Sequence, residues 1–528
     1  MDGIPLALEL AAARVALPTP QQIATRLDDR FRLLTGGSRT ALPRQQTLRS
    51  LIDWSYDLLS PPERSLLCRL AVFVGGWSLE AAEAICPDLE VFELLAQLVQ
   101  KSLVVAEEND NATANRFRLL ETIRQYARDR LLEMDTGAVT RDRHLDYYMK
   151  FAEAGEINFY GPGRLEWQDR CDLELDNFRA AIQWGLDHDV VAALRLGGAI
   201  AIFWVSRPLT MEGRRWLQAT LDQMVLPEFQ SKADRQLLAA RAKGLIGISQ
   251  LNYGDGDYRA GLDACQEGAQ LYRQLDDPFG LAFALCALGN IAAFQGEGDL
   301  AEGALTEAIQ IGRALGNQTI LSYAHGVLST YVYLPRGDIE SARASAEESL
   351  RSSQEGGQSF GVVLGELVLA RIAQITEEWD AARAHALTAI ELAREIREPV
   401  ILSQVTTELA DIELRAGNLA EVERYNQECL LVFKRIGQRA YIAHGLESLA
   451  FIAQAKDQPE RAACLFGAAE AVREGLGISL IGITCLENEY AIAIAWLHTR
   501  LDETAYAACW SEGCCMTMDQ AIAYALEE

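Results

Sequence analysis

Four residues near the C-terminus are the strongest candidates for metal ligands in this sequence. His498 lies upstream of Cys509, Cys514 and Cys515. Structural zinc sites are built from thiolates and imidazoles, and their cysteines come in closely spaced pairs such as Cys-x2-Cys. The three cysteines here lack that pairing, so we predict that the chain holds no metal.

Residues that could act as catalysts are present, but none stands in a motif that would activate it. The chain has 6 histidines, each isolated from any serine or cysteine motif. The spacing Gly-x-Ser-x-Gly occurs at Gly357–Gly361, but there it stands at a helix breaker and not after a strand, so it is no nucleophile elbow; no Gly-x-Gly-x-x-Gly turn occurs in a strand context. No lysine follows a glycine, which excludes a P-loop, whose amides and lysine would hold nucleotide phosphates. The sequence therefore predicts a protein that is not an enzyme and carries no cofactor.

The composition narrows the class of protein further. The chain has 528 residues, 49% of them hydrophobic, and a net charge of −27. Such an excess of negative charge is unfavourable for coating nucleic acid or an anionic membrane. The best candidate for a membrane span, residues 196–206, is far shorter than the about 20 residues required. The 11 scattered cysteines are typical of the reducing cytoplasm, where we expect the chain to act.

The elements that would position a binding site form a repeat with a period of about 40 residues. Its turns are Gly256-Asp257, Gly298-Asp299, Gly337-Asp338, Glu378-Trp379, Gly417-Asn418 and Asp457-Gln458. A helix pattern follows each turn, then a second breaker and a more apolar helix pattern. We expect glycine to supply the positive φ that ends a helix, and Asp or Asn to cap the next one.

One helix pair cannot bury its apolar face alone, so neighbouring pairs must stack. The sequence therefore predicts an all-α fold with a repeat superhelix over residues 235–475, the alternative being an irregular helical bundle. Residues 134–234 are expected to form an irregular helical segment leading into it, and residues 476–528 a C-terminal helical cap. The period and the Gly-Asp turns resemble the tetratricopeptide family in its longer bacterial form.

Residues 46–133 have a different pattern. Helices are predicted at 47–60, 62–74, 78–86 and 91–101, and strands at 102–107 and 116–119. Ser78 suits the N-cap of the third helix, without a capping box because Ala81 follows. Several helices followed by a hairpin predict a winged-helix domain.

Several motifs resemble one class of signalling protein. Residues 3–7 match the Gly-x-Pro motif of the NB-ARC or STAND class of signal-transducing ATPases. Segments resembling the bacterial regulators of that class, AfsR-like and LuxR-like, are 53–60, 70–78, 117–129, 177–186 and 212–221. The resemblance is to their C-terminal part, a winged helix followed by tetratricopeptide repeats. It implies a regulator of transcription or signal transduction that lacks its P-loop domain here.

Two consequences follow from that resemblance. Residues 1–45 would be a helical remnant of the ATPase module, with Gly3 and Pro5 a relic of a nucleotide-contacting motif. The alternative is that Pro5 simply starts the first helix. Related eukaryotic members carry a histidine where this chain has Leu120, and leucine cannot donate the corresponding hydrogen bond to nucleotide.

Three functions are compatible with these patterns. The first is the sensing and relay part of a regulator, which binds a protein or peptide through the repeats and couples to a separate P-loop ATPase module. The second is a free-standing scaffold. The third is a transcription factor that reads DNA through the winged helix. Residues 45–133 hold 9 basic and 14 acidic residues, which disfavours the third. The locally basic stretch 14–49 is expected to face protein.

The partner is expected on the concave surface that stacked repeats create. In the tetratricopeptide family the first helix of each pair lines that surface, which here means residues 281–294, 322–333, 361–374, 403–415 and 443–454. The predicted partner-binding residues are Asn290, Tyr323, Tyr331, Glu366, Arg371, Gln404 and Glu408. Charge reversal at Arg371 and Glu408 is expected to abolish binding without changing thermal unfolding. The alternative is a smooth inner wall that binds nothing.

We predict that this chain neither binds nor hydrolyses ATP, because nothing in it can cradle the β- and γ-phosphates. Calorimetric titration with millimolar ATP and ADP is expected to give no saturable heat. A micromolar dissociation constant would contradict the prediction.

Overall fold

The computed structural model describes residues 48–107, 116–160, 163–207, 209–224, 235–254, 257–395, 402, 405–406, 408–410, 412–413, 419–436, 439–475 and 486–526. The chain divides into two compact units. The first comprises residues 1–156, 166–200 and 215–244, and the second residues 157–165, 201–214 and 245–528. No helix in the described part of the chain is both long and apolar enough to cross a membrane.

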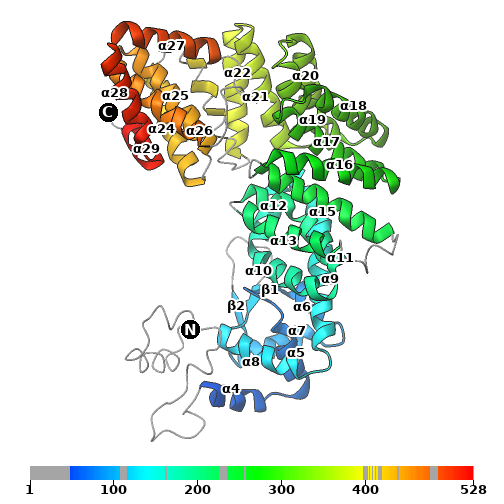
Figure 1. Ribbon diagram of the computed structural model, residues 1–528. Helices are drawn as coiled ribbons and strands as arrows, with labels where there is room; N and C mark the ends of the chain where they lie inside the picture. The colour runs from blue at the N-terminus through cyan, green and yellow to red at the C-terminus, as the bar shows by residue number, and fades with distance from the viewer. Residues whose placement is uncertain are drawn as a thin grey trace, which may run out of the picture. The chain divides into compact units, whose positions relative to one another are not determined.

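The first unit begins with the predicted winged helix (Figure 1). Its helices are α4 (Leu48–Asp57), α5 (Pro61–Leu70), α6 (Leu79–Ile85) and α7 (Val91–Gln100). Its strands are β1 (Trp77–Ser78), β2 (Val105–Glu107) and β3 (Arg116–Arg118), in the antiparallel order β1-β3-β2. The helices and the hairpin confirm the prediction, whereas the sequence pattern missed β1, which has only two residues. Ser78 caps α6 as expected, by accepting a hydrogen bond from the Ala81 amide at 3.2 Å.

Further helices follow the winged helix. They are α8 (Glu121–Leu132), α9 (Gly137–Gly155), the 3-10 helix η3 (Glu156–Tyr160), α10 (Arg164–His188), α11 (Val190–Ala199), α12 (Ala201–Ser206) and α13 (Thr210–Gln223). Their lengths range from the 25 residues of α10 to the 6 of α12, without the regular repeat seen later in the chain.

One buried side chain on α10 holds the turn between α5 and β1. The Asn177 side chain is fully buried, and its Oδ1 accepts a hydrogen bond from the Val74 amide at 2.8 Å. Its Nδ2 donates to the Gly76 carbonyl at 2.8 Å and to Glu174 at 2.7 Å. Gly76 has a φ of 130°, a conformation that favours glycine. Asn177 therefore joins α10 to the turn between α5 and β1. The shape of that turn depends on the backbone conformation of Gly76.

The hydrogen bonds of Asn177 continue into a buried polar cluster. Glu174 also accepts from the Tyr148 hydroxyl at 2.7 Å and pairs with Arg116 of β3. His144 lies against Tyr148, with ring centroids 4.7 Å apart, and its burial lowers its pKa to about 4. Each buried polar group has a partner, which is the condition under which such a network stabilises a fold.

The second unit consists mainly of stacked helix pairs (Figure 1). The helices are α15 (Arg235–Gly254), α16 (Tyr258–Gln274), α17 (Pro278–Phe294), α18 (Gly298–Leu315), α19 (Gln318–Val327), η4 (Leu328–Tyr333), α20 (Ile339–Glu355), α21 (Ser359–Ile375), α22 (Trp379–Glu395), α24 (Leu419–Ile436), α25 (Arg439–Ala455), α26 (Pro459–Glu474), α27 (Leu486–Arg500), α28 (Glu503–Cys515) and α29 (Met518–Leu526). This confirms the predicted all-α superhelical fold with a preceding winged helix.

The helix breakers act largely as the sequence predicts. Gly316 has a φ of 62°, and the Asn317 side chain caps α19 by accepting from the Ile320 amide at 3.0 Å. Gly337, with a φ of 73°, is followed by the cap Asp338. The expectation for Gly298-Asp299 was wrong. The left-handed residue is Gly296, and Asp299 lies inside the first turn of α18 because that helix already begins at Gly298.

Close approach between helices depends on small residues. A Cβ at Gly289 of α17 would lie 2.4 Å from the Leu305 side chain of α18, so a larger residue at this position would force α17 and α18 apart or displace Leu305. Around this contact, alanines alternate with larger side chains such as Leu285 and Ile291, all buried. The helices pack tightly because the repeat pattern places small side chains where they touch.

The first helix of the third pair changes its winding. After α19, residues of η4 form a π-helix, with the Leu334 amide donating to the Ser329 carbonyl five residues back at 3.1 Å. Ser329 is fully buried, and its hydroxyl donates to the Ala342 carbonyl of α20 at 2.7 Å. A π-turn rotates the following side chains relative to an α-helix, and such turns are frequent at functional sites.

We predict that Asn177→Ala lowers the free energy of unfolding of the first unit by about 2 kcal/mol, because it removes the hydrogen bonds that Val74 and Gly76 make to this side chain. Urea denaturation followed by circular dichroism is the measurement. Asp176→Ala is the matched control. Asp176 is an exposed carboxylate that pairs only with the neighbouring Arg179 on the surface, so we expect a change below about 0.5 kcal/mol. Equal effects of the two substitutions would contradict the role given to Asn177.

Candidate ligand groove on the repeat helices

Aromatic side chains from successive repeats meet in the second unit. Tyr253 at the end of α15 lies 5.1 Å from Phe294 at the end of α17, measured between ring centroids. Phe294 in turn lies 4.6 Å from Tyr331 of η4. Tyr258, at the start of α16, packs 6.0 Å from Phe294. The cluster therefore spans three consecutive repeats, and the π-helix supplies one of its members.

These side chains are enclosed by protein and yet reach solvent. Tyr331 is 38% exposed, but burial raises the pKa of its hydroxyl. Burial also raises the pKa of Tyr253 well above its ordinary value, although this residue is only half-buried. The aromatic cluster therefore presents partly exposed ring surface on the first helices of three successive pairs.

A single ion pair lies beside the aromatic residues. The Nε of Arg371, on α21, donates to a carboxylate oxygen of Glu408 at 2.8 Å. The Arg371 side chain is 35% exposed, whereas the Glu408 side chain is 11% exposed. Glu408 is the largest cause of the raised pKa of Arg371.

Tyr441 of α25 joins the same site. Burial raises the pKa of Tyr441 to about 12, and Tyr331, Arg371 and Glu408 all act on it electrostatically. We call the surface formed by Tyr253, Phe294, Tyr331, Arg371 and Tyr441 the aromatic groove. Its members come from α15, α17, η4, α21 and α25, which are the first helices of their pairs.

The predicted site residues have different environments. Tyr323 on α19 is 39% exposed, and Asn290 on α17 is half-buried. Glu366 accepts a contact from His385 at 2.7 Å, which directs its carboxylate to the second helix of its own pair. Glu408, which we predicted to bind the partner, is almost fully buried against Arg371, so a partner would hardly reach its carboxylate.

Some predicted residues lie outside the described part of the chain. They are Gln404, Gly3 and Pro5. The sequence prediction missed Tyr253, Phe294 and Tyr441. Tyr253 and Phe294 both occupy the last turn of a first helix, about 40 residues apart. An aromatic residue recurring at one repeat position is therefore the signal that could have identified them.

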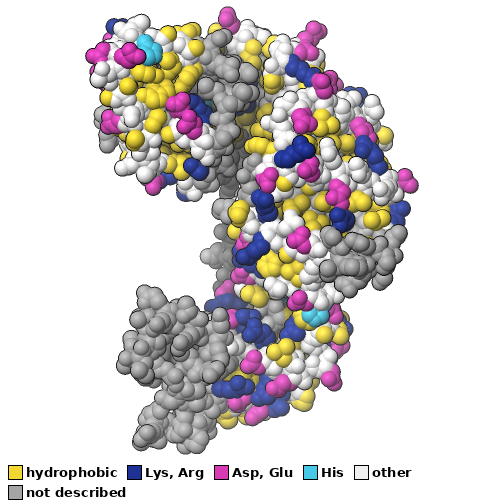
Figure 2. Space-filling view, in the orientation of Figure 1, with side chains coloured by type: hydrophobic (Ala, Val, Ile, Leu, Met, Phe, Trp, Pro, Cys, Tyr) yellow, Lys and Arg dark blue, Asp and Glu magenta, His cyan; other side chains and the backbone are white. Residues whose placement is uncertain are grey.

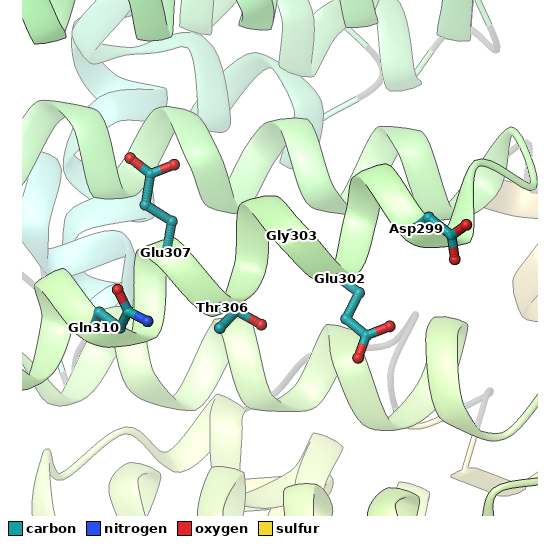
Figure 3. A pocket seen from close by; sticks show the side chains of 6 residues that line it. All are labelled: Asp299, Glu302, Gly303, Thr306, Glu307 and Gln310. Atoms are coloured by element: carbon teal, nitrogen blue, oxygen red, sulfur yellow. The ribbon is translucent and has the colours of Figure 1, made fainter.

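A second hollow lies on the surface of α18 (Figure 3). Its lining is acidic, but its carboxylates are already paired. Arg336 contacts Asp299 at 2.8 Å and Glu302 at 2.5 Å, and Arg273 contacts Glu307 at 2.7 Å. These pairs join neighbouring repeats, so the hollow is a structural surface. Acidic and basic side chains are also interspersed over the described residues of the face shown in Figure 2.

Metal chemistry finds no support in the described residues, where no group of three or more possible ligands is brought together. Cys509, Cys514 and Cys515 all lie on α28. The Cys514 thiol donates to the Gly467 carbonyl at 3.3 Å, so its role is packing between α26 and α28.

Comparisons with known proteins agree with this architecture. Residues 59–132 match the family model of a winged helix-turn-helix domain. An HTH-type transcriptional regulator of Mycobacterium tuberculosis is 35% identical over 440 residues, which cover 80% of this chain and 47% of the relative. Regulatory protein AfsR of Streptomyces griseus is 26% identical over 420 residues, covering 76% of this chain and 41% of AfsR. The chain thus spans about half the length of the curated relatives it matches.

A solved structure shares the fold. It is the crystal structure of a signal transduction ATPase with numerous domains, with a tetratricopeptide repeat sensor, from Pyrococcus horikoshii. The match has a TM-score of 0.53 at 15% identity and covers 95% of this chain and 74% of that one.

We predict that Glu408→Arg lowers the free energy of unfolding by about 2 kcal/mol, because it sets two cations against each other where one is mostly buried. Arg371→Glu combined with Glu408→Arg is expected to recover part of that loss. Urea denaturation of the single and double variants measures both effects.

Reversal of the exposed pair Arg424–Glu428, spaced (i,i+4) on α24, is the control. We expect it to change stability by less than about 0.5 kcal/mol. A Glu408→Arg variant as stable as this control would contradict the prediction and agree with the expectation from the sequence that charge reversal here leaves unfolding unchanged.

Proposed function

We propose, from the premise that this chain corresponds to the winged-helix and repeat part of an AfsR-like bacterial regulator, that it is the non-catalytic sensing and relay portion of such a protein. In the cytoplasm, the repeats bind a peptide or a segment of a protein in the aromatic groove. The winged-helix unit passes the binding event to a P-loop ATPase module.

The aromatic groove supports the sensing role. Extended peptides bind well where rigid aromatic side chains and a few polar groups line a concave surface. Phe294 and Tyr331 are 39% and 38% exposed, so they present ring surface that a bound chain can cover. The observation that carries the proposal is that partly exposed aromatic rings from three successive first helices lie in contact with one another.

The winged-helix surface favours a relay role and disfavours the binding of DNA. In DNA-binding helix-turn-helix proteins the second helix of the motif enters the major groove and carries basic or amide side chains to the bases. Here that helix is α7, which has no lysine or arginine, and its exposed residues include Phe92 and Glu93. Lys101, which follows α7, pairs with the buried Glu63. An acidic, partly apolar surface suits contact with protein.

We predict that the purified chain retains a subset of random synthetic hexapeptides, and that Tyr331→Ala reduces the retained amount at least about tenfold. The loss of affinity would match the removal of a central aromatic contact. Size-exclusion separation of bound peptides and their quantification by mass spectrometry is the measurement. Leu315→Ala, at the exposed end of α18, is the control because Leu315 is 43% exposed and lies outside the aromatic groove.

Two outcomes would overturn the proposal. Equal retention by the Tyr331→Ala and Leu315→Ala variants would place peptide binding elsewhere, and retention of no peptide would exclude it. Duplex DNA bound by the chain with submicromolar affinity at physiological salt would instead favour the DNA-reading function.

A further inference from the structure

We propose that the second unit contains a sliding joint where α19 and η4 meet α20. At this joint, small polar side chains replace the apolar ones that hold other helix pairs together. The joint lets α19 shift along α20 while the pairs on either side stay packed. This inference goes beyond the proposed function and does not depend on a ligand.

The side chains that α20 buries are small. The structure describes every residue of α20, and the buried ones are Ala342, Ser345, Ala346, Ser349, Ser352 and Ser353. Its two larger apolar residues, Ile339 and Leu350, are only partly buried. The second helices of the neighbouring pairs bury branched apolar side chains, as α18 does with Leu305 and α22 with Ile390. The pairing of α20 therefore gains less from apolar burial than the pairing of those helices.

The apolar core of the second unit is interrupted at α20. One cluster of buried apolar residues extends through α17 and α18 to Val332 of η4, and another begins at Val363 of α21. Between them lies a cluster of five buried residues, to which α20 contributes Ala342 and Ala346. Apolar burial is the main force that couples neighbouring repeats, so two blocks of the superhelix are joined weakly here.

Hydroxyl groups take the place of apolar contacts between α19 and α20. The Ser322 and Ser353 hydroxyl oxygens lie 2.5 Å apart and share a hydrogen bond. The Ser349 hydroxyl donates to the Ser322 carbonyl at 2.8 Å, and the Ser353 hydroxyl donates to the Ser349 carbonyl of its own helix at 2.9 Å. A hydrogen bond formed on folding replaces one to water, so each contributes less than a buried leucine would.

These hydroxyls can change partners when the helices move. A serine inside a helix has a second acceptor in the carbonyl four residues back, which Ser353 already uses. On α19, Gly326 faces the Ser349 hydroxyl, and a Cβ at Gly326 would lie 3.1 Å from that oxygen. At this point neither helix carries a large side chain that interlocks with the other. Interlocking side chains are what fix the relative position of packed helices, so sliding meets little resistance here.

The π-helix at the end of α19 can take up such a shift. The Leu334 amide donates to the Ser329 carbonyl five residues back, and the Ser329 hydroxyl donates to the Ala342 carbonyl of α20 at 2.7 Å. A π-turn holds one residue more than an α-turn, so conversion between the two shifts the adjoining helix by about 1.5 Å. Because Tyr331 lies in η4, the same shift would change its contact with Phe294.

Native-state hydrogen exchange of the wild-type chain, followed by mass spectrometry, tests the joint. We expect amides of residues 318–355, which cover α19, η4 and α20, to have protection factors at least about tenfold lower than those of residues 278–315 and 359–395. Local opening that leaves the neighbouring pairs intact exposes amides in this way. Equal protection across residues 278–395 would overturn the proposal.

A reversible crosslink tests whether the opening takes place between α19 and α20. The contact between the hydroxyls of Ser322 and Ser353 places these residues within reach of a disulfide, so the double variant Ser322→Cys with Ser353→Cys is measured oxidised and reduced. Oxidation is expected to slow exchange in α20 at least about tenfold, and reduction to restore it. The wild-type chain under the same two conditions is the control for the native cysteines, and its exchange in α20 is expected to stay unchanged.

The crosslink has its own outcomes against the proposal. A closed disulfide, verified by mass, that leaves exchange in α20 unchanged would show that α19 and α20 do not separate there. Failure of the disulfide to close would show that the two side chains do not face each other. Either result would overturn the sliding joint, and the measurement on the wild-type chain stands whether or not the variant folds.

Discussion

A single pair of helices in the repeat region cannot bury its own apolar side chains, and this constraint organises the second unit. Each pair must meet the next, so glycine and alanine stand where helices touch, as at Gly289. Ion pairs one repeat apart, such as Arg273–Glu307 and Arg343–Glu378, accompany the stacking. Exposed pairs of this kind contribute less than about 1 kcal/mol each, so apolar burial supplies the stability. Stacking of this kind also produces an inner surface that is lined by one helix of each pair.

Much of the fold could be predicted because its signals are local. A left-handed residue followed by a capping side chain, as in Gly316-Asn317, needs only its own neighbours to act. The same holds for Ser78 at the start of α6. The strand β1 escaped prediction because two residues carry no periodicity, and it exists through pairing with a strand much later in the chain. The π-helix was also not predicted, because it accompanies the packing of Ser329 against α20, which comes later in the chain.

The candidate site could be predicted only in part. Assigning first helices to the inner surface pointed to Tyr331 and Arg371, which stay predicted partner-binding residues. It could not bring in Tyr441, whose position relative to Tyr331 depends on curvature summed over several repeats. Nor could it show that Glu408 would be buried, because whether a polar residue on an inner helix faces solvent or its neighbour depends on the partner that it finds. Here that partner is Arg371, one repeat earlier.

The π-helix η4 gives the aromatic groove an unusual evolutionary property. A π-turn accommodates more residues per turn than the about 3.6 of an α-helix, so the loss of one codon here would return the segment to α-helical winding. The helix pair would persist, because its stacking partners remain, but the side chain at Tyr331 would turn away from Phe294. A single in-frame deletion in a related gene would thus change which aromatic rings meet on this surface, while the stacked helix pairs stay the same.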